Sequence, residues 1–281
     1  MKKLLIILNV VAVLCILKYA SLLFLWKLPQ ELELRAFNIG QGDSLMLAIP
    51  NSSIQILIDG GPDDEVVEKL REYLPAGDDF VDIIILTHGH DDHVGGLPSV
   101  IENFEVGLVI DTGAVCDNPN YQKMIEQIEL LSLPKLYAVR GEKIRIGPDF
   151  ILEIVHPFFS QNVEYKNLNN ASITAIASYQ EKKIVLTGDL EVEGENEVLK
   201  YLRERGELAK LKADVLKVGH HGSKTATSIE FLETINPQQA VISSGRGNNF
   251  GHPHQEIITK LKKKDITILR TDRDKDVLIK L

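Results

Sequence analysis

Three histidines and two aspartates fall within six residues of this 281-residue chain. The stretch His88-Gly89-His90-Asp91-Asp92-His93 follows an apolar run, residues 81–86, that we interpret as a buried strand. Neutral imidazoles and carboxylates suit borderline divalent ions such as Zn²⁺, and also Mn²⁺ or Fe²⁺. Because this close spacing has few structural uses, we predict that the loop binds metal and is more than a polar surface loop.

The other histidines extend the same pattern. Seven of the eight lie in three short clusters, at residues 88–93, 220–221 and 252–254. Each cluster follows a predicted strand, whereas histidines of a core would be scattered. His156 is the exception, because it precedes Pro157 at a strand end, and we interpret it as structural.

Asp189 closes another predicted strand, in Leu186-Thr187-Gly188-Asp189. Taken alone, it would read as a turn or helix-capping aspartate. Beside two other candidate metal loops it becomes a candidate bridge, because a carboxylate between two cations lets them share a hydroxide nucleophile.

The elements that must position these residues come in a repeated order. Hairpins are followed by strands that alternate with helices, and this happens twice along the chain. Two mixed β-sheets packed face to face with helices outside, an αββα sandwich of the α/β class, would satisfy this order. The metal loops would then follow strand ends along one edge. Helices are predicted at residues 63–73, 97–103, 121–131, 195–205, 228–235 and 253–263, the last with Pro253 in its first turn.

The N-terminal residues have a pattern typical of a membrane anchor. Residues 4–26 have only four polar interruptions and would span about 34 Å as a helix. We predict a single-pass transmembrane anchor and linker at residues 1–30, and one hydrolase domain at residues 31–281. A cleaved signal peptide is the alternative, although no small-x-small cleavage site is present. Lys2 and Lys3 favour an extracytoplasmic domain, and Lys27 weighs against it.

Composition limits the classes of partner and of metal site. Residues 1–30 hold four lysines and no acid, so residues 31–281 have 27 basic and 40 acidic residues, a net charge of −13. This argues against a broadly basic surface that coats nucleic acid, though not against a local basic groove. Two cysteines, Cys15 and Cys116, exclude a cysteine-rich zinc site.

Together these motifs resemble the metallo-β-lactamase fold superfamily. The run from His88 to His93, Thr187-Gly188-Asp189 and a late histidine carry this resemblance. Further segments resemble the hydrolase domain of ComEC-type competence proteins: Phe37-Asn38-Ile39-Gly40-Gln41-Gly42-Asp43-Ser44, Leu57-Ile58-Asp59-Gly60-Gly61, Asn169-Asn170-Ala171-Ser172, His220-His221-Gly222-Ser223 and Gly251-His252-Pro253. The similarity covers about residues 32–281.

The resemblance implies two divalent ions, zinc or manganese. His88 and His90 would hold the first ion, and Asp92 and His93 the second. Asp189 would bridge them. Either His220 or His221 would supply the last imidazole, and the run His221-Gly222-Ser223 favours His221. His220 would then support a ligand from behind or face the substrate.

One departure from the superfamily pattern affects the first ion. Members usually supply a further histidine between the first cluster and the bridging aspartate, and here only His156 lies in that interval. Asn170 and Ser172 occupy the corresponding segment. We therefore expect a weaker first site, or one that prefers manganese.

Other polar residues are expected around the ligands. Asp43 and Asp59 would orient ligating imidazoles, with ordinary turn carboxylates as the alternative. Hydroxyl, amide and cationic donors for a phosphate are expected on the late loops, at Ser223, Lys224, Arg246 and Asn248. His252 would protonate a leaving oxygen, so the predicted catalytic set is Asp92, Asp189 and His252.

These expectations describe a membrane-anchored, extracytoplasmic, metal-dependent phosphodiesterase. The resemblance adds DNA, which makes the enzyme a nuclease acting during DNA uptake, either free-standing or beside a separate channel protein. One alternative is hydrolysis of another ester, such as a choline-phosphate diester of the cell wall. The run His220-His221-Gly222-Ser223 disfavours a β-lactam or a thioester. A non-catalytic metal-dependent binding module is the remaining alternative.

Overall fold

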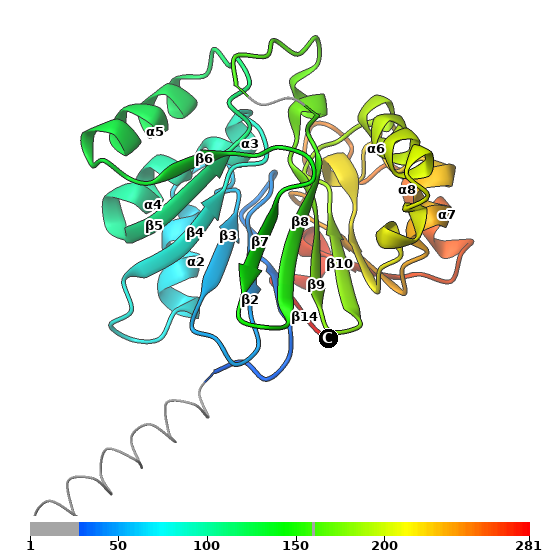
Figure 1. Cartoon of the computed structure of the whole chain (residues 1–281), viewed down its shortest axis with the longest axis horizontal. Coiled ribbons are helices and arrows are strands. Elements are labelled where there is room, and N and C mark those ends of the chain that lie inside the picture. Colours follow the sequence, from blue (N-terminus) through cyan, green and yellow to red (C-terminus); the bar gives the residue numbers. More distant parts are fainter. Residues whose placement is uncertain (1–27, 159–160) are drawn as a thin grey trace, which may run out of the picture.

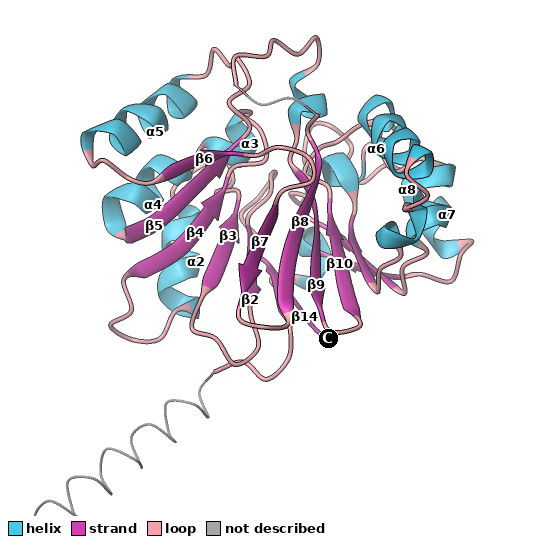
Figure 2. Ribbon diagram, in the orientation of Figure 1, coloured by secondary structure: helices cyan, strands magenta, loops and turns pink. Residues whose placement is uncertain are grey.

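Two β-sheets face each other across an apolar core in the computed structural model, which describes residues 28–158 and 161–281 (Figures 1 and 2). Within these residues each sheet has seven strands. Helices cover both outer faces, so the predicted arrangement of two mixed sheets with helices outside is confirmed for the described part of the chain.

The first sheet is antiparallel on one side and parallel on the other. Its order is β14 (Val277–Lys280), β1 (Glu33–Ala36), β2 (Leu45–Ala48), β3 (Gln55–Ile58), β4 (Phe80–Ile85), β5 (Glu105–Asp111) and β6 (Lys135–Tyr137). Strands from β14 to β3 pair antiparallel, and strands from β3 to β6 pair parallel.

The second sheet repeats this division. Its order is β13 (Thr267–Arg270), β12 (Gln239–Ile242), β11 (Val215–Lys217), β10 (Lys182–Leu186), β9 (Thr174–Tyr179), β8 (Phe150–His156) and β7 (Lys143–Ile146). The four strands from β10 to β13 are parallel, and β7 to β10 pair antiparallel.

Amphipathic helices cover the outside of each sheet. On the first sheet lie α2 (Glu65–Tyr73), α4 (Leu97–Asn103) and α5 (Pro119–Leu130); on the second lie α6 (Val192–Glu204), α7 (Ile229–Ile235) and α8 (Gln255–Lys262) (Figure 1). The short helices α3 (Asp91–Val94) and α9 (Thr271–Asp274) complete the described α-helices. In α2, Val66, Val67 and Leu70 face the sheet, the spacing expected of a one-sided helix.

Helix α8 and strand β6 are among the elements that differ from the sequence prediction. Helix α8 begins at Gln255 and not at Pro253, because His254 is extended and donates its N–H to the carbonyl of Gly222. Strand β6 was not expected, since three partly exposed residues carry too little pattern to indicate a strand.

The parallel halves of the sheets explain where the metal loops meet. Strands that run parallel end at the same edge, where β4, β10 and β11 each lead into a loop that carries candidate ligands and β12 leads into the loop of His252. Within residues 28–158 and 161–281, no helix is long and apolar enough to cross a bilayer. The predicted anchor, residues 4–26, lies outside the described residues.

Candidate metal centre

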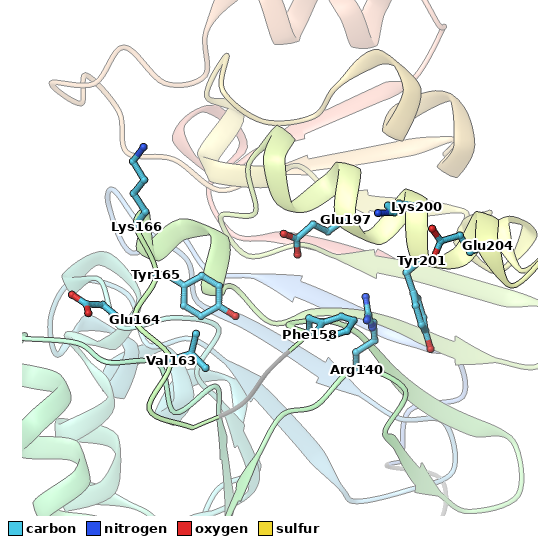
Figure 3. A pocket seen from close by; sticks show the side chains of 10 residues that line it. All are labelled: Arg140, Phe158, Val163, Glu164, Tyr165, Lys166, Glu197, Lys200, Tyr201 and Glu204. Carbon is cyan, nitrogen blue, oxygen red and sulfur yellow. The ribbon is translucent and has the colours of Figure 1, made fainter.

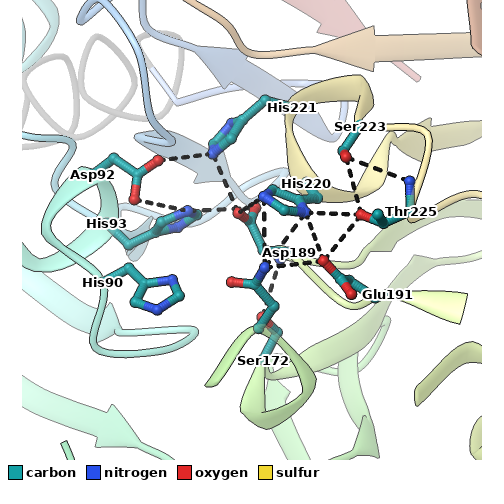
Figure 4. Close-up of polar contacts among 12 residues, drawn as sticks. His90, Asp92, His93, Ser172, Asp189, Glu191, His220, His221, Ser223 and Thr225 are labelled. Atoms are coloured by element: carbon teal, nitrogen blue, oxygen red, sulfur yellow. Dashed lines mark hydrogen bonds and ion pairs between the residues drawn. The ribbon is translucent and has the colours of Figure 1, made fainter. Parts of the chain in front are cut away.

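The carboxylate of Asp189 lies at the centre of the converging loops (Figure 4). Its Oδ1 is 3.3 Å from Nε2 of His93, which comes from the first sheet. Its Oδ2 is 3.3 Å from Nε2 of His221, which comes from the second sheet. The third member of this group is Asp92, whose Oδ2 is 3.1 Å from Nε2 of His221. The structure thus brings together Asp92 and His93, which were predicted for the second ion, the predicted bridge Asp189, and His221.

Hydrogen bonds behind the imidazoles set which nitrogen faces the group. Nδ1 of His93 lies 2.7 Å from Oδ2 of Asp59, so it donates to that carboxylate. Nδ1 of His221 lies 3.0 Å from the carbonyl oxygen of Ser243, which can only accept. Both Nε2 atoms therefore point toward Asp189, and Asp59 occupies the orienting position predicted for it.

His88 and His90 form a second convergence beside the first. Nε2 of His88 lies 3.0 Å from Nδ1 of His90. Behind His88, its Nδ1 is 3.3 Å from the hydroxyl of Ser172, which also accepts the N–H of Asp189. Ser172 thus supports one predicted ligand and the bridging residue. His156 contacts the carbonyl of Ser172 through Nδ1, in keeping with a structural role.

The backbone at His220 and His221 separates two adjacent imidazoles. Both residues are left-handed, with φ of 47° and 51°, a conformation that costs about 1–3 kcal/mol for a residue other than glycine. His221 is buried, while the His220 side chain is 22% exposed. Nδ1 of His220 is 3.1 Å from Oε1 of Glu191, and its Nε2 is 3.7 Å from Oδ2 of Asp189. This geometry favours His221 as the ligand and leaves His220 at the rim.

The electrostatics of the group favour added positive charge. Burial alone would lower the pKa of His93 and of His221, yet the surrounding carboxylates, Asp189 foremost, raise both well above the usual value. Burial would raise the pKa of Asp189, but His221 and His93 hold it well below its usual range. Asp189 thus stays ionised and gathers positive charge, and a metal would displace the protons that now balance it.

The donor set fits divalent cations. Nε2 of His93 and Oδ1 of Asp189 are buried and face each other at 3.3 Å, and within the described residues neither atom makes a well-formed hydrogen bond. Leaving such polar atoms unpaired is costly unless a cation coordinates them. Imidazole nitrogens with carboxylate oxygens are the ligand types that zinc and manganese accept.

Asp43 also reaches this group, because one ligand atom each from Asp43, His93, Asp189 and His221 lie within 4.8 Å of one another. Its Oδ2, however, is 2.7 Å from Nζ of Lys217, and its Oδ1 is 3.3 Å from Nδ1 of His221. The carboxylate therefore lies behind His221, on the side away from Nε2. This is the orienting position predicted for Asp43.

The predicted phosphate donors differ in what their side chains contact. The amide of Asn248 bonds to the backbone of its own loop. Asn170, which was predicted in the segment of the missing histidine, contacts the N–H of Glu191 and the carboxylate of Glu193. The hydroxyl of Ser223 lies 2.9 Å from that of Thr225. The side chains of Lys224 and Arg246 are exposed. Only these two cations remain open to an incoming anion without rearrangement.

His252 lies beside the predicted ligands. Its ring centroid is 5.3 Å from that of His220 and 6.2 Å from that of His221. Burial and the neighbouring histidines lower the pKa of His252 to about 4, so the ring is neutral at pH 7. A neutral imidazole still donates one N–H to a phosphate oxygen, and proton donation would need an anionic substrate to raise this pKa.

Several residues of the centre were not anticipated. Glu191 accepts from Thr225 and from Asn169 and contacts His220. Lys217 pairs with Asp43 although its side chain is fully buried. The signal for Lys217 was present, since it is one lysine in an otherwise apolar strand, whereas Glu191 carried no signal beyond its place two residues after Asp189.

A separate pocket of about 610 Å³ contains none of the predicted site residues (Figure 3). Its wall includes Arg140, whose guanidinium carbon lies 3.7 Å from the ring centroid of Phe158 and 3.7 Å from that of Tyr201. The full lining is Arg140, Phe158, Val163, Glu164, Tyr165, Lys166, Glu197, Lys200, Tyr201 and Glu204. Equal numbers of cationic and acidic side chains give it no clear preference for an anion.

Comparison with known proteins agrees with the geometry. Residues 39–246 match the model of the metallo-beta-lactamase superfamily. The chain is 34% identical over 271 residues to ComE operon protein 3 of Bacillus subtilis (strain 168), which covers 90% of this chain and 34% of that protein. Competence protein ComA of Neisseria gonorrhoeae is 27% identical over 247 residues, covering 86% of this chain and 31% of that protein. The chain thus spans about a third of the length of these relatives.

Solved structures share the fold at low sequence identity. The metallo hydrolase Igni18 of Ignicoccus hospitalis matches with a TM-score of 0.54 and 14% identity over 89% of this chain and 99% of that one. The metallo-beta-lactamase fold protein YhfI of Bacillus subtilis matches with a TM-score of 0.53 and 14% identity over 89% of this chain and 100% of that one. The chain therefore belongs to the metallo-β-lactamase superfamily, and the two competence proteins named above are relatives of the ComEC type.

Proposed function

We propose that the chain is a metal-dependent phosphodiesterase that cleaves DNA during uptake, held outside the membrane by its N-terminal segment. The observation that carries the proposal is the position of Asp189 among His93, His221 and Asp92, beside the convergence of His88 and His90. The likeness to competence proteins supports DNA as the substrate.

Two divalent ions, zinc or manganese, would supply a water of lowered pKa and neutralise charge on the phosphoryl oxygens. His88 and His90 would hold one ion, while Asp92, His93 and His221 would hold the other, with Asp189 between them. Asp59, Asp43 and the carbonyl of Ser243 keep the ligating imidazoles in the required orientation.

Exposed donors would receive the substrate. Lys224 and Arg246 are open to a phosphate, and His252 and His220 lie at the rim where a leaving oxygen would emerge. The domain is acidic overall, so local cations must provide the attraction that a broadly basic surface provides elsewhere.

The proposal is tested by incubating the full chain with single-stranded DNA, duplex DNA and bis-p-nitrophenyl phosphate, with Mn²⁺ or Zn²⁺ added. We expect DNA cleavage that chelation abolishes. Asp189→Ala should lower turnover by at least about 100-fold, since one residue serves both ions. Asp149→Ala, an exposed aspartate away from the centre, is the matched control and should cleave normally.

Two other outcomes would contradict the proposal. Turnover of the small diester with intact DNA would favour a different ester, such as a choline-phosphate diester of the cell wall. Binding of two ions without turnover of any substrate would favour a non-catalytic metal-dependent binding module. A protease-accessibility assay on intact cells tests the location: an extracytoplasmic domain is digested, and a cytoplasmic one is protected.

A further inference from the structure

The loop that follows β12 presents an aromatic ring to solvent beside the metal centre. Phe250 is 66% exposed, and no other phenylalanine in the described part of the chain is more exposed. Its ring stacks on His252, with centroids 5.7 Å apart and an interplanar angle of 23°. His252 in turn meets His220 edge to face, with centroids 5.3 Å apart. The exposed ring is therefore continuous with the rim of the centre.

This loop, residues 243–252, is braced from within. The Nδ2 group of Asn248 donates to the carbonyls of Gly245, at 2.8 Å, and of His252, at 2.6 Å. Its Oδ1 accepts the N–H of Phe250 and that of His252, each at 3.0 Å. Four hydrogen bonds from one side chain fix the loop without any ligand. A surface held in place before binding loses little entropy when a partner arrives.

The position of the ring matters because the domain lacks a basic surface. Residues 31–281 carry a net charge of −13, so nucleic acid gains little from long-range attraction. Exposed cations near the ring are local: Arg246 lies on the same loop, and Lys224, whose backbone N–H donates to Nδ1 of His254, lies on the neighbouring one. Stacking of a base on an aromatic ring adds affinity that does not depend on net charge.

We propose that Phe250 and His252 form a stacking surface for one unpaired nucleobase, next to the phosphate received at the metal centre. The inference rests on the proposed phosphodiesterase function and makes its substrate more specific. A base inside a duplex has both faces covered by its neighbours, whereas a base in a single strand or at a frayed end can lie on the ring. The substrate would accordingly be single-stranded DNA or an unpaired end.

The test separates base contacts from backbone contacts, and binding from turnover. Full-length protein with Mn²⁺ is titrated into two labelled phosphorothioate hexanucleotides, which resist hydrolysis. One carries thymine at every position, and the other is abasic throughout. Phe250→Ala should weaken binding of the thymine strand by about 5- to 150-fold, the range of one aromatic stacking contact. It should leave the abasic strand unchanged, and Phe250→Tyr should restore binding.

The matched control is Leu130→Ala, which removes an exposed apolar side chain on α5 and should change neither affinity. Equal losses on both strands, or no loss on either, would overturn the proposal. A loss caused by Tyr201→Ala and not by Phe250→Ala would place the base in the pocket around Arg140 instead. Equal affinity of the wild type for the two strands also overturns it, even where DNA cleavage upholds the proposed function. Base-dependent binding without cleavage would uphold stacking and contradict the nuclease.

Discussion

At the scale of single residues, Lys217 and Asp43 form an ion pair in the interior behind the centre. Lys217 is fully buried, and its Nζ lies 2.7 Å from Oδ2 of Asp43 and 3.0 Å from the carbonyl of Val218. Burial would raise the pKa of Asp43, but Lys217 and His221 outweigh it and hold this pKa below its usual value. The Asp43 carboxylate is therefore ionised in the interior, where Lys217 is its partner.

Lys217→Met should accordingly destabilise the protein by about 3–5 kcal/mol, because it leaves a buried carboxylate without its partner. The measurement is urea unfolding with chelator present, so that metal binding does not contribute. Adding Asp43→Asn to the same chain should recover part of the loss. A double variant whose loss equals the sum of the two single losses would show that the two residues are not coupled.

The buried carboxyl of Asp111 should make the stability of the protein depend on pH. Burial raises the pKa of this carboxyl above its usual value of 3.8, although the hydroxyl of Tyr121 donates to it at 2.7 Å. A raised folded-state pKa contributes stability that is complete below pH 3.8 and is lost as pH rises through the folded-state value. Asp111→Asn removes this loss. The free energy of unfolding of the variant, relative to that of wild type, should therefore be higher at pH 7 than at pH 4, measured by urea unfolding at both values.

The matched comparison for Asp111 is Asp149, which is exposed. Asp149→Asn should show the same difference from wild type at pH 4 and at pH 7. If Asp111→Asn behaves in this way too, burial of the Asp111 carboxyl does not govern the pH dependence.

At the scale of elements, the turn before β2 must pass close to α3, the helix that carries two of the candidate ligands. A side-chain carbon on Gly42 would lie 2.2 Å from the carbonyl oxygen of Asp92, and the N–H of Asp43 donates to that oxygen at 3.0 Å. The turn and α3 can approach only because residue 42 lacks a side chain.

Gly42→Ala should therefore weaken metal binding by more than about tenfold, since relief of the clash must move the backbone of Asp92. The readout is metal affinity by competition with a fluorescent chelator. Gly40→Ala is the matched control, because Gly40 also has positive φ, of 78°, but no atom within 4 Å of the added carbon. It should cost about 1 kcal/mol in stability with normal affinity. Similar affinities in the two variants would show that the close approach is unimportant.

The elements also show what the sequence could and could not predict. Local spacing was sufficient for the loop at residues 88–93 and for the order of strands and helices, because both depend on near neighbours. The partnership of Lys217 with Asp43 joins distant segments, so no local pattern encodes it. The run His221-Gly222-Ser223 favoured His221 over His220, but the two left-handed residues that separate their side chains are not revealed by residue type. Asn248 was expected to face a phosphate, but its own loop uses all its hydrogen-bonding groups.

At the scale of the whole molecule, the centre joins the two sheets. Asp92 and His93 follow a strand of the first sheet, while Asp189 and His221 follow strands of the second. Ions held by both groups would connect the two halves, so metal binding should stabilise the complete fold.

Saturating Mn²⁺ or Zn²⁺ should accordingly raise the melting temperature relative to chelator. An ion at about a thousand times its Kd contributes about 4 kcal/mol, or about 8–16 °C for a domain of this size. Differential scanning calorimetry measures the shift. Asp189→Ala should lose most of it, and Asp149→Ala should keep it. An equal shift in both variants would place the stabilising ion elsewhere.

The pairing of β14 with β1 makes the fold suitable for circular permutation. Leu32 and Leu281 exchange backbone hydrogen bonds of 3.1 and 3.0 Å, so the two ends of the fold are immediate neighbours. Figure 1 shows this end of the strands far from α3, which carries two of the candidate ligands. A short peptide could join residue 281 to residue 31, and new termini could be opened at the exposed turn of Gln180 and Glu181. Such a circular permutant should retain the candidate metal centre. A fusion or surface tether next to residue 32 or residue 281 would leave the edge with the candidate ligands facing outward.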